Sequence, residues 1–567
     1  MSVQGNTGTP RVGGRRVAVI GGGIGGLATA ALLAAEGHTV TLLEKQDRVG
    51  GRAGSWEAGG FRFDTGPSWY LMPEVIDHFF RLMGTSAAEQ LELIRLDPGY
   101  RVIFEENREA VDVPADRPAV VKLFESLEPG AGEALEKYLD SAEDTYTIAK
   151  RRFLYSTFES FLPLLRPDVL VRLPKLVRLL LQPLSGFVAG RFADPRLRQI
   201  LGYPAVFLGS SPFDAPSMYH LMSHLDLDDG VLYPMGGFTS LIAAMTKVAE
   251  EAGVDIRTGA DVTSIDTASI DTASIDTASI DTASIDTAPI DTAAANAGPS
   301  RRRGSRRPRA RVTGVSYRSG GTVHRMEADV VVAAADLHHT ETVLLPENRQ
   351  TYPEKYWSRR VPGPSALLLY LGVKGSLPQL EHHTLLFTTD WKDNFGRIFG
   401  AETSIPTPAS LYVCRPSATD PSVAPAGDEN VFVLVPIPAD VGIGGGGVDR
   451  GGDARVEELA DAVIAQIAEW AHIPDLAERI VLRRTYGPRD FASDLNAWRG
   501  TSLGPAHTLR QSAFLRGSNR SRKVEGLYYA GSSTVPGIGI PMCLISAELV
   551  VKRLRSDTST GPLPEPA

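Results

Sequence analysis

The sequence is poor in cysteine, in long apolar runs and in positive charge. Its 567 residues include two cysteines, Cys414 and Cys543, which form no CxxC pair, so neither a disulfide framework nor a metal site is predicted. The formal net charge of −9 argues against a nucleic-acid partner, because phosphate binding needs a cationic surface. Apolar runs such as residues 366–371 are far shorter than the ~20 residues that span a bilayer. A reducing cytoplasm suits such a chain.

Length and composition indicate a large globular enzyme. Hydrophobic residues make up 43% of the chain and charged residues 22%, enough to build a substantial core. A chain of 567 residues suits two large domains. Residues 1–14 are rich in Gly and Thr and are expected to form a disordered leader, and the Pro-, Thr- and Ser-rich residues 556–567 a loose tail.

The fold is expected to begin with a βαβ unit. An apolar strand (residues 17–20), a glycine turn, an Ala- and Leu-rich helix (25–36) and a second strand (39–44) follow one another with the spacing of that unit. This order predicts the start of a doubly wound α/β domain.

The glycine turn matches the dinucleotide-binding pattern GxGxxG. Gly21 allows the tight turn, Gly23 lets the backbone approach a pyrophosphate, and Gly26 lets helix and strand pack closely. The helix N-terminus offers free N–H groups to the phosphates. Glu44 ends the second strand, where its carboxylate can accept hydrogen bonds from ribose hydroxyls. The alternative for Glu44 is a surface carboxylate without a ligand.

A second signal distinguishes FAD from NAD. Residues 47–52, Asp-Arg-Val-Gly-Gly-Arg, resemble the GG-R extension of glutathione-reductase-like flavoproteins, which include amine oxidases and carotenoid desaturases. Residues 60–68 resemble the flavin-proximal turn of this group, and residues 526–531 its late strand and glycine turn. Val262 falls where such proteins hold the adenine by backbone contacts.

Four further segments resemble the bacterial phytoene desaturase family. Residues 232–238 are similar to its YPxGG segment, 328–340 to its strand and ADxH turn, and 412–421 to a segment associated with that family alone. Residues 534–541 resemble its C-terminal signature, usually GTHPGAGIPG, with departures at Val535, Ile538 and Met542. If these positions face the substrate, they change the product.

The resemblance implies a Rossmann-like FAD-binding domain of the glutathione-reductase and amine-oxidase type, with an interleaved α+β substrate domain and a membrane-facing helical part. It implies FAD contacts from Gly21, Gly23, Ile24, Gly25, Gly26, Glu44, Lys45, Gly51, Arg52, Gly66, Pro67, Ser68, Val262, Gly531, Ser532, Gly539, Ile540 and Pro541. The expected FAD segments are residues 15–100, 226–340 and 486–555, and the expected substrate segments are 101–225 and 341–485.

The implied reaction is desaturation of phytoene towards lycopene or a less desaturated intermediate. A hydrocarbon offers no polar group, so an apolar tunnel must bind it. Flavin N5 accepts a hydride and a proton leaves the neighbouring carbon. Asp64 is a candidate for a catalytic role, and a backbone cap in its Asp-Thr-Gly turn is the alternative. Oxygen or a quinone would reoxidise the flavin.

The paired histidines are expected to cap or pack. His338, His339, His382 and His383 lack a helical i, i+4 partner, which gives poor chelating geometry.

Residues 172–181 are expected to form a helix in a membrane interface. Arg172, Lys175 and Arg178 fall on one helical face and Leu173, Val177 and Leu180 on the opposite one, with Pro174 near the helix start. The pattern predicts a cytoplasmic protein bound peripherally to the cytoplasmic membrane. A core helix with a solvated basic side is the alternative.

A repeat interrupts the chain. Ile-Asp-Thr-Ala-Ser recurs from Ile265 to Ala294 with a period of five, which fits neither helix nor strand, and seven arginines follow in residues 301–311. A solvated loop at 266–310 is favoured over a nucleic-acid or anionic-lipid contact. The loop is expected to join strands of one sheet, because strand patterns flank it at residues 255–257, 261–265, 311–317 and 323–333.

Two other functions remain open. An amine-oxidase-like enzyme acting on a soluble amine shares the N-terminal motifs, and an FAD-binding scaffold without activity would keep them all. Within the desaturase group, isomerases, ketolases and dehydrogenases of other carotenes share most of the later motifs.

Overall fold

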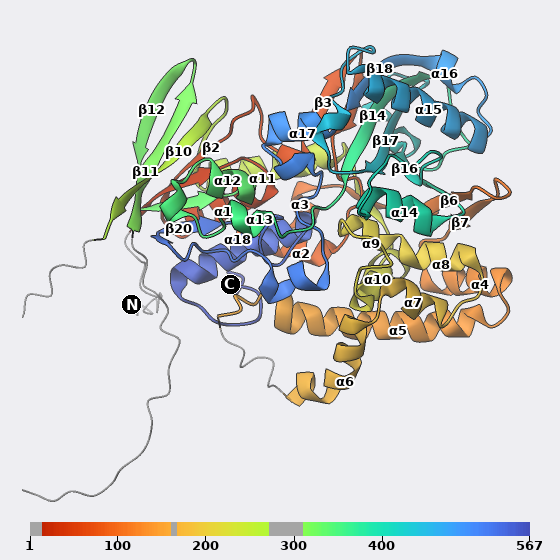
Figure 1. Ribbon diagram of the computed structural model, residues 1–567, viewed down its shortest axis with the longest axis horizontal. Helices are drawn as coiled ribbons and strands as arrows, with labels where there is room; N and C mark the ends of the chain where they lie inside the picture. The colour runs from red at the N-terminus through yellow and green to blue at the C-terminus, as the bar shows by residue number, and fades with distance from the viewer. Residues whose placement is uncertain (1–13, 160–166, 271–309, 567) are drawn as a thin grey trace, which may run out of the picture.

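The computed structural model describes residues 14–159, 167–270 and 310–566. A parallel sheet lies on the left in Figure 1, a larger mixed sheet at the upper right, and a group of helices at the lower right. Nearly all of the predicted leader, and residues 271–309 of the predicted insert, lie outside the described residues.

A five-stranded parallel sheet in the order β20-β13-β1-β2-β9 forms the first half of the molecule. Strand β1 is apolar after its first residue because both of its faces are covered. Val17 and Val19 pack against the core of helices α1, α11 and α18, whereas Ala18 and Ile20 pack on the opposite side. The elements are β1 (Arg16–Ile20), β2 (Thr39–Leu43), β9 (Asp255–Arg257), β13 (Val330–Ala333), β20 (Leu527–Tyr529), α1 (Ile24–Ala35), α11 (Phe238–Glu251) and α18 (Ile540–Arg555).

A smaller antiparallel sheet covers that opposite side. It contains β10 (Asp261–Ser269), β11 (Ala310–Ser319) and β12 (Thr322–Glu327), and β19 (Val524–Glu525) pairs with β11. The predicted insert joins β10 to β11, neighbours in one sheet, as expected. Two predicted boundaries are wrong. The single strand expected at 323–333 is two strands, β12 and β13, and β10 continues four residues beyond Ile265.

The first repeat unit belongs to the sheet because strand alternation suits it. Ile265 is buried, and the ladder then runs to Ser269, which pairs with Ala310. The remaining repeats from residue 271 on, and the arginines up to Arg309, lie outside the described residues.

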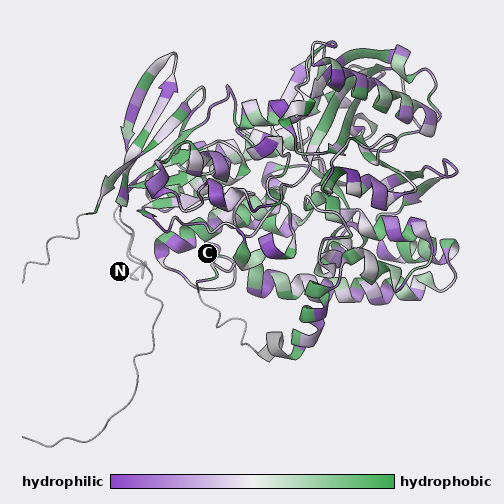
Figure 2. Ribbon diagram, in the orientation of Figure 1, coloured by the Kyte–Doolittle hydropathy of each residue, from purple (hydrophilic) through white to green (hydrophobic). Residues whose placement is uncertain are grey.

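A seven-stranded mixed sheet in the order β18-β14-β17-β16-β15-β6-β7 forms the second half of the molecule. Helix α15 (Ala454–Trp470) shares a core with one face, and the other face shares a core with the helical group. Hydrophobic residues concentrate in these strands in Figure 2. The strands are β6 (Tyr100–Phe104), β7 (Ala110–Val113), β14 (Ser365–Lys374), β15 (His383–Phe387), β16 (Leu411–Cys414), β17 (Asp428–Ile437) and β18 (Ile480–Tyr486).

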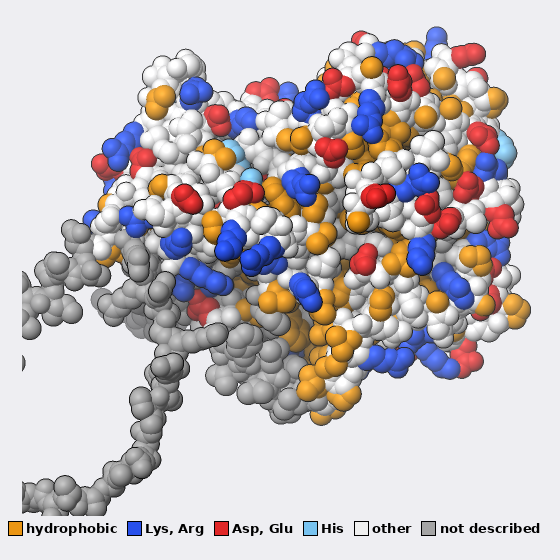
Figure 3. All heavy atoms as spheres, viewed as in Figure 1, with side chains coloured by type: hydrophobic (Ala, Val, Ile, Leu, Met, Phe, Trp, Pro, Cys, Tyr) orange, Lys and Arg blue, Asp and Glu red, His pale blue; other side chains and the backbone are white. Residues whose placement is uncertain are grey.

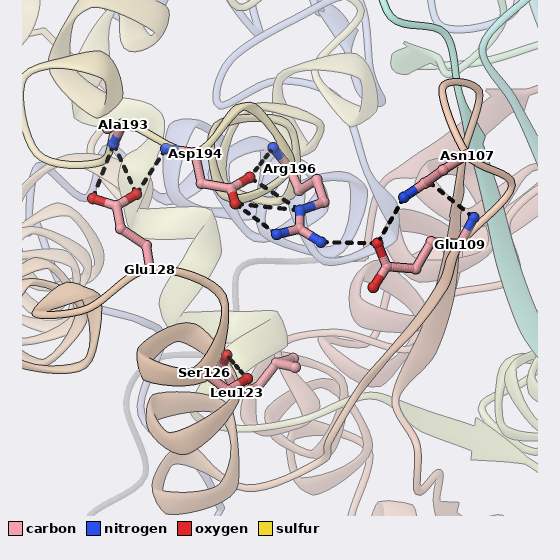
Figure 4. Close-up of polar contacts among 8 residues, drawn as sticks. All are labelled: Asn107, Glu109, Leu123, Ser126, Glu128, Ala193, Asp194 and Arg196. Atoms are coloured by element: carbon pink, nitrogen blue, oxygen red, sulfur yellow. Dashed lines mark hydrogen bonds and ion pairs between the residues drawn. The ribbon is translucent and has the colours of Figure 1, made fainter.

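The helical group is tied to the second sheet by charged side chains at the start of α8 (Figure 4). Glu128 accepts hydrogen bonds from the backbone N–H groups of Ala193 and Asp194 at 2.9 and 2.7 Å. Arg196 pairs with Asp194 at 2.8 Å and with Glu109, next to β7, at 2.9 Å. The group comprises α4 (Arg117–Leu127), α5 (Ala131–Ala149), α6 (Pro167–Leu181), α7 (Leu184–Ala189), α8 (Pro195–Gly202), α9 (Pro204–Phe207) and α10 (Met222–Leu227).

Short elements connect the two halves. The pair β5–β8 brings residues 93–95 beside residues 232–234, and β3 pairs with β4. The remaining strands and α-helices are β3 (Ser55–Ala58), β4 (Phe61–Asp64), β5 (Leu93–Arg95), β8 (Leu232–Pro234), α2 (Pro73–Leu82), α3 (Ala87–Gln90), α12 (Leu337–Thr342), α13 (Glu354–Trp357), α14 (Trp391–Phe399), α16 (Leu476–Arg479) and α17 (Pro488–Leu495).

The C-terminal segment predicted to be a loose tail is packed instead. Leu563 is buried, and its backbone N–H donates to Glu548 at 3.0 Å. Glu565 lies 2.8 Å from Nδ1 of His78 on α2. Burying one leucine contributes about 1.5–3 kcal/mol. Composition predicts disorder here because the segment has few apolar residues, but one leucine and two tertiary contacts suffice to dock it.

Among the described residues, no helix is long and apolar enough to cross a bilayer. Helix α6 begins at Pro167, so Pro174 lies inside the helix and not near its start. The expected position is therefore wrong, and the missing N–H of Pro174 removes one intrahelical hydrogen bond.

Removal of residues 270–309 should leave the fold and its flavin content intact. Ser269 and Ala310 are cross-strand partners, so an Asn-Gly turn can join them as a two-residue hairpin. Loop closure costs about 0.6 kcal/mol per doubling of length, so the melting temperature should stay the same or rise slightly. A matched deletion of residues 267–309 also removes paired residues of β10 and should lower it. Aggregation of the first variant would contradict this account.

Candidate flavin and substrate site

A cavity of about 1250 Å³ is lined by residues from the parallel sheet, the seven-stranded sheet and the helical group. Pockets for single small ligands are typically about 300–1,000 Å³, so this one has room for more than a cofactor. It includes the region beyond β1 where the glycine turn enters α1, which is where doubly wound sheets bind ligands.

The three glycines of the GxGxxG pattern are required for different structural reasons. Gly21 has φ of 96°, a left-handed conformation, and a Cβ at Gly26 would lie 1.9 Å from the carbonyl oxygen of Gly21. Gly23 has an ordinary φ of −74°, and the nearest atom to a Cβ there is 3.9 Å away. Protein packing therefore requires Gly21 and Gly26 but not Gly23, whose missing side chain leaves space beside the N-terminus of α1. That space fits an anionic group bound close to the backbone.

Glu44 is buried at the end of β2 and lines the cavity. Its carboxylate accepts from the backbone N–H of Gly22 at 2.6 Å and of Gln46 at 2.8 Å. Each carboxylate oxygen has more than one acceptor site, so the arrangement fixes the carboxylate and still allows it to accept from ribose hydroxyls. Lys45, by contrast, donates to the carbonyl oxygen of Ser493 at 2.6 Å.

Arg52 follows the glycine pair of the GG-R segment and also lines the cavity. Its Nε and Nη2 atoms are buried without a hydrogen-bond partner among the described residues. Unpaired buried guanidinium nitrogens are costly unless a ligand satisfies them, so this side chain fits a role in holding an acidic or carbonyl-bearing group.

The structure brings the predicted cofactor residues together from distant segments. Gly26 alone among them does not line the cavity, and its position is a packing position as described above. The others that line it are Gly21, Gly23, Ile24, Gly25, Glu44, Lys45, Gly51, Arg52, Gly66, Pro67, Ser68, Val262, Gly531, Ser532, Gly539, Ile540 and Pro541.

Asp64 is not among the cavity-lining residues. Its carboxylate accepts from the backbone N–H of Phe238 at 2.7 Å and of Thr239 at 3.1 Å, at the start of α11. Burial raises the pKa of Asp64 to about 6, and these hydrogen bonds oppose the shift. Asp64 therefore caps the N-terminus of α11 and not its own Asp-Thr-Gly turn, so the cap expected from the sequence is misplaced, and its position off the cavity wall gives no support to the catalytic role.

The sequence motifs missed an aromatic and cationic group on the wall of the cavity. Arg484 of β18 lies with its Cζ 5.1 Å from the ring centre of Trp56 and 5.8 Å from that of Tyr370. All three residues line the cavity. They come from three strands without a shared motif, so only the folded sheet reveals the group.

The remainder of the wall is mostly apolar. Aromatic and aliphatic side chains of the seven-stranded sheet, α9, α14 and α17 line it, and side chains of α6 complete it. The apolar set from the sheet and neighbouring helices includes Val206, Phe207, Leu368, Leu385, Phe387, Trp391, Phe395, Leu434 and Phe491, and the set from α6 comprises Leu173, Leu176, Val177 and Leu180.

The two histidines at 338 and 339 begin α12. Both backbone N–H groups donate to the Asp336 carboxylate, at 2.9 and 3.3 Å. The His338 ring pairs with Glu354 at 2.9 Å, and His339 lines the cavity with its pKa lowered by burial. Asp336 therefore supplies the cap, and of the two expected roles the histidines show packing, with the His338 ring edge-on to Trp357 at 5.3 Å between ring centres.

The departures from the C-terminal signature lie in two environments. Ile538 and Met542 line the cavity, as does Cys543, whereas Val535 belongs to the core beneath α18. Two of the three departures therefore change the shape of the cavity itself.

Comparisons with known proteins agree with this geometry. The model of the family described as flavin containing amine oxidoreductase matches residues 24–296 and 287–555. The chain belongs to this family. A carotenoid 3,4-desaturase of Haloarcula japonica is 40% identical over 96% of this chain and 99% of its own length. A zeta-carotene-forming phytoene desaturase of Myxococcus xanthus is 33% identical over 95% of this chain and 94% of its own length.

A solved structure shows the fold. An oxidoreductase from Methanosarcina mazei superposes with a TM-score of 0.55 over 95% of this chain and 100% of its own, at 16% sequence identity. The predicted α/β fold of the FAD-binding amine-oxidase type, the predicted FAD cofactor and the enzyme class of FAD-dependent oxidoreductase are confirmed, as is the resemblance to carotenoid desaturases.

Gly23→Ala should lose FAD without losing the fold. A methyl group there meets no protein atom within 3.9 Å but fills the space beside α1, so FAD affinity should fall about tenfold or more, about 1.4 kcal/mol. The apoprotein should keep its melting temperature. Adding Glu44→Ala should weaken FAD further. As a contrast, Gly26→Ala should destabilise the apoprotein itself. A full flavin spectrum in the purified Gly23→Ala Glu44→Ala variant would show that the cofactor lies elsewhere.

Proposed function

We propose that this protein desaturates a long carotenoid hydrocarbon, using FAD held by the glycine turn, Glu44 and Arg52. The observation that carries the proposal is one continuous cavity. It joins the glycine turn, Glu44 and Arg52, together called the nucleotide cradle, to an apolar wall and to helix α6. An extended hydrocarbon can be bound only by such a wall, because it offers no hydrogen-bonding group. The relatives named desaturases, aligned over nearly the whole chain, support the same reaction class.

Each part of the wall has a task in this proposal. Bound FAD supplies the hydride acceptor. The leucine and phenylalanine side chains hold the polyene in line and exclude water, which would otherwise add to the developing positive charge on the hydrocarbon. Arg484 stays beside Trp56 and Tyr370, where the aromatic faces stabilise its charge.

Phytoene, converted towards lycopene or a less desaturated intermediate, is the proposed substrate, with an oxygen or quinone acceptor. A second candidate is a later desaturation on another carotene. This second candidate is favoured by sequence identity: the chain is 40% identical to the Haloarcula 3,4-desaturase and 33% identical to the Myxococcus phytoene desaturase. Ile538 and Met542, which depart from the common signature, lie on the cavity wall where they can set which bond reaches the flavin.

We further propose that α6 lies in the surface of the cytoplasmic membrane and admits the substrate. Val171 and Leu181 are 80% and 70% exposed, unusual for large apolar side chains. Hydrophobic side chains gather over α6 at the lower edge of Figure 3. Leu173 and Val177 are both partly exposed and cavity-lining, so the cavity reaches the same surface.

The basic residues of α6 are arranged differently from the expectation. Arg172 and Lys175 pair with Asp144 of α5 at 3.0 and 2.8 Å. They therefore attach α6 to α5 on the helical side opposite Leu173 and Val177, and apolar burial is left as the main contribution to lipid binding.

A soluble amine is a poorer substrate for this cavity. An amine would need an acceptor or aromatic cage beside the flavin, and burial of its charge in the apolar wall would be costly.

The reaction can be followed from the spectrum of the product. Purified protein with FAD and liposomes containing either phytoene or lycopene is incubated, and the extracted lipid is examined by chromatography and visible absorption. Conversion of phytoene to a coloured polyene supports the first candidate. Red-shifted product from lycopene alone supports the second. Turnover of neither carotene, with rapid oxidation of an amine, would contradict the proposed function.

Replacement of Val171 and Leu181 by Ser should weaken liposome binding by about tenfold or more, because each buried CH₂ contributes about 0.8 kcal/mol. Neither residue lines the cavity, so flavin content and turnover in detergent should not change. The matched control is Val323→Ser with Val481→Ser, at exposed positions of β12 and β18. Equal co-sedimentation of the two double variants would show that α6 does not contact lipid.

A further inference from the structure

Strand pairing brings two histidines and a cysteine together in the second sheet. His383 begins β15 and is the cross-strand partner of Cys414, the last residue of β16, and His382 directly precedes His383. All three are buried, at 4%, 0% and 4% exposure for His382, His383 and Cys414. One ligand atom of each lies within 4.8 Å of the others. In the described part of the chain, no other group of three or more His, Cys, Asp or Glu side chains converges in this way.

One nitrogen of each histidine ring has a partner and the other does not. Nδ1 of His382 lies 2.8 Å from the hydroxyl of Thr419, and Nδ1 of His383 lies 2.6 Å from the hydroxyl of Tyr412. Both Nε2 atoms are buried with no hydrogen-bond partner among the described residues. Metal-bound histidines show this pattern, in which the second ring nitrogen is held by a hydrogen bond and orients the ring. Without a bound ion, nothing among the described residues offsets the cost of burying these two Nε2 atoms.

The distances fit an ion after a small adjustment. Nitrogen and sulfur bind such ions at about 2.0–2.3 Å, so two ligand atoms on one ion are at most about 4.5 Å apart. A set within 4.8 Å therefore needs only slight side-chain rotation. The surroundings hold the rings in place: Trp69 stacks on His383 at 4.6 Å between ring centres, and Tyr233 packs against His382 at 4.6 Å.

Charge selects the ion. A thiolate and two neutral imidazoles sum to one negative charge, which a monovalent cation neutralises, whereas a divalent cation would leave a net buried positive charge. Two neighbouring charges act on His382, and both are paired elsewhere: Arg415 pairs with Glu429 at 2.8 Å, and the Asp420 carboxylate accepts from the backbone N–H groups of Gly236 and Ser422 at 2.6 and 2.9 Å. Cysteine sulfur and imidazole nitrogen are ligands that suit Cu(I).

We propose that His382, His383 and Cys414 form a buried three-ligand site for a monovalent copper ion. On binding, Cu(I) forms a bond to Sγ of Cys414, the thiol proton leaves to solvent, and no electron is transferred. The spacing of the histidines alone predicted no metal site, because the third ligand comes from a strand thirty residues away in the sequence and reaches the pair only through sheet register.

The site adjoins the flavin and substrate cavity without opening into it. His382, His383 and Cys414 are not cavity-lining residues, but Trp69 and Tyr412, which contact His383, are. An ion there would therefore stiffen one wall of the cavity.

The test uses the purified full-length flavoprotein and Cu(I) under anaerobic reducing conditions with a competing coloured chelator. About one copper per chain should remain after desalting, as measured by mass spectrometry of metals. Cys414→Ser should lower affinity for Cu(I) by roughly tenfold or more. Cys543→Ser is the matched control, since it removes the other thiol, lies on the cavity wall and should bind copper as the wild type does.

A second measurement needs no variant. Cu(I) should raise the melting temperature of the wild-type protein, because a ligand that binds the folded state stabilises it, whereas Zn(II) at the same concentration should not. No retained copper in the wild type, or equal retention in Cys414→Ser, overturns the site. Stoichiometric zinc in place of copper overturns the charge argument and with it the assigned ion. None of these readouts depends on desaturase activity, so they stand apart from the proposed function.

Discussion

The open space that Gly23 leaves beside the N-terminus of α1 is the constraint on which the proposed flavin site depends. Gly21 must be glycine because of its left-handed backbone, and Gly26 because a Cβ there would clash with Gly21. Neither reason applies to Gly23, which has an ordinary backbone conformation and open space around its Cα. The glycine at position 23 therefore makes sense only with a bound group beside the backbone. The parallel sheet, the short strand–helix turn and the buried Glu44 carboxylate all hold that space in a fixed shape.

The second half of the molecule extends this space into an apolar one. Its seven strands come from two separate parts of the chain, and their cavity-facing residues alternate with core residues on the opposite face. Interleaving of the two halves places the end of the nucleotide cradle against the start of the apolar wall. A flavin and a hydrocarbon can then meet without water, which neither half could arrange alone.

Motifs predicted the parts of the site that are local in sequence. The glycine turn, Glu44 and the GG-R segment were found because turn and ligand contacts require particular residues at fixed spacing. Arg484 with its aromatic neighbours, and Cys414 with His383, could not be found in that way, since strand register alone joins them. Composition predicted a loose tail at the C-terminus, but Leu563 is docked against Glu548. It also predicted a loop from residue 266, but residues up to Ser269 continue the β10 ladder. The role of Asp64 needed its distant partner, the start of α11.

The most direct test of the central claim is flavin reduction by a carotene in the absence of oxygen. The purified enzyme is mixed anaerobically with liposomes that contain phytoene or lycopene, and the absorbance of oxidised flavin is followed beside that of the polyene. We expect one of these carotenes to bleach the flavin while the conjugated system of that carotene lengthens. Flavin that stays oxidised with both carotenes but is bleached by a soluble amine would contradict it.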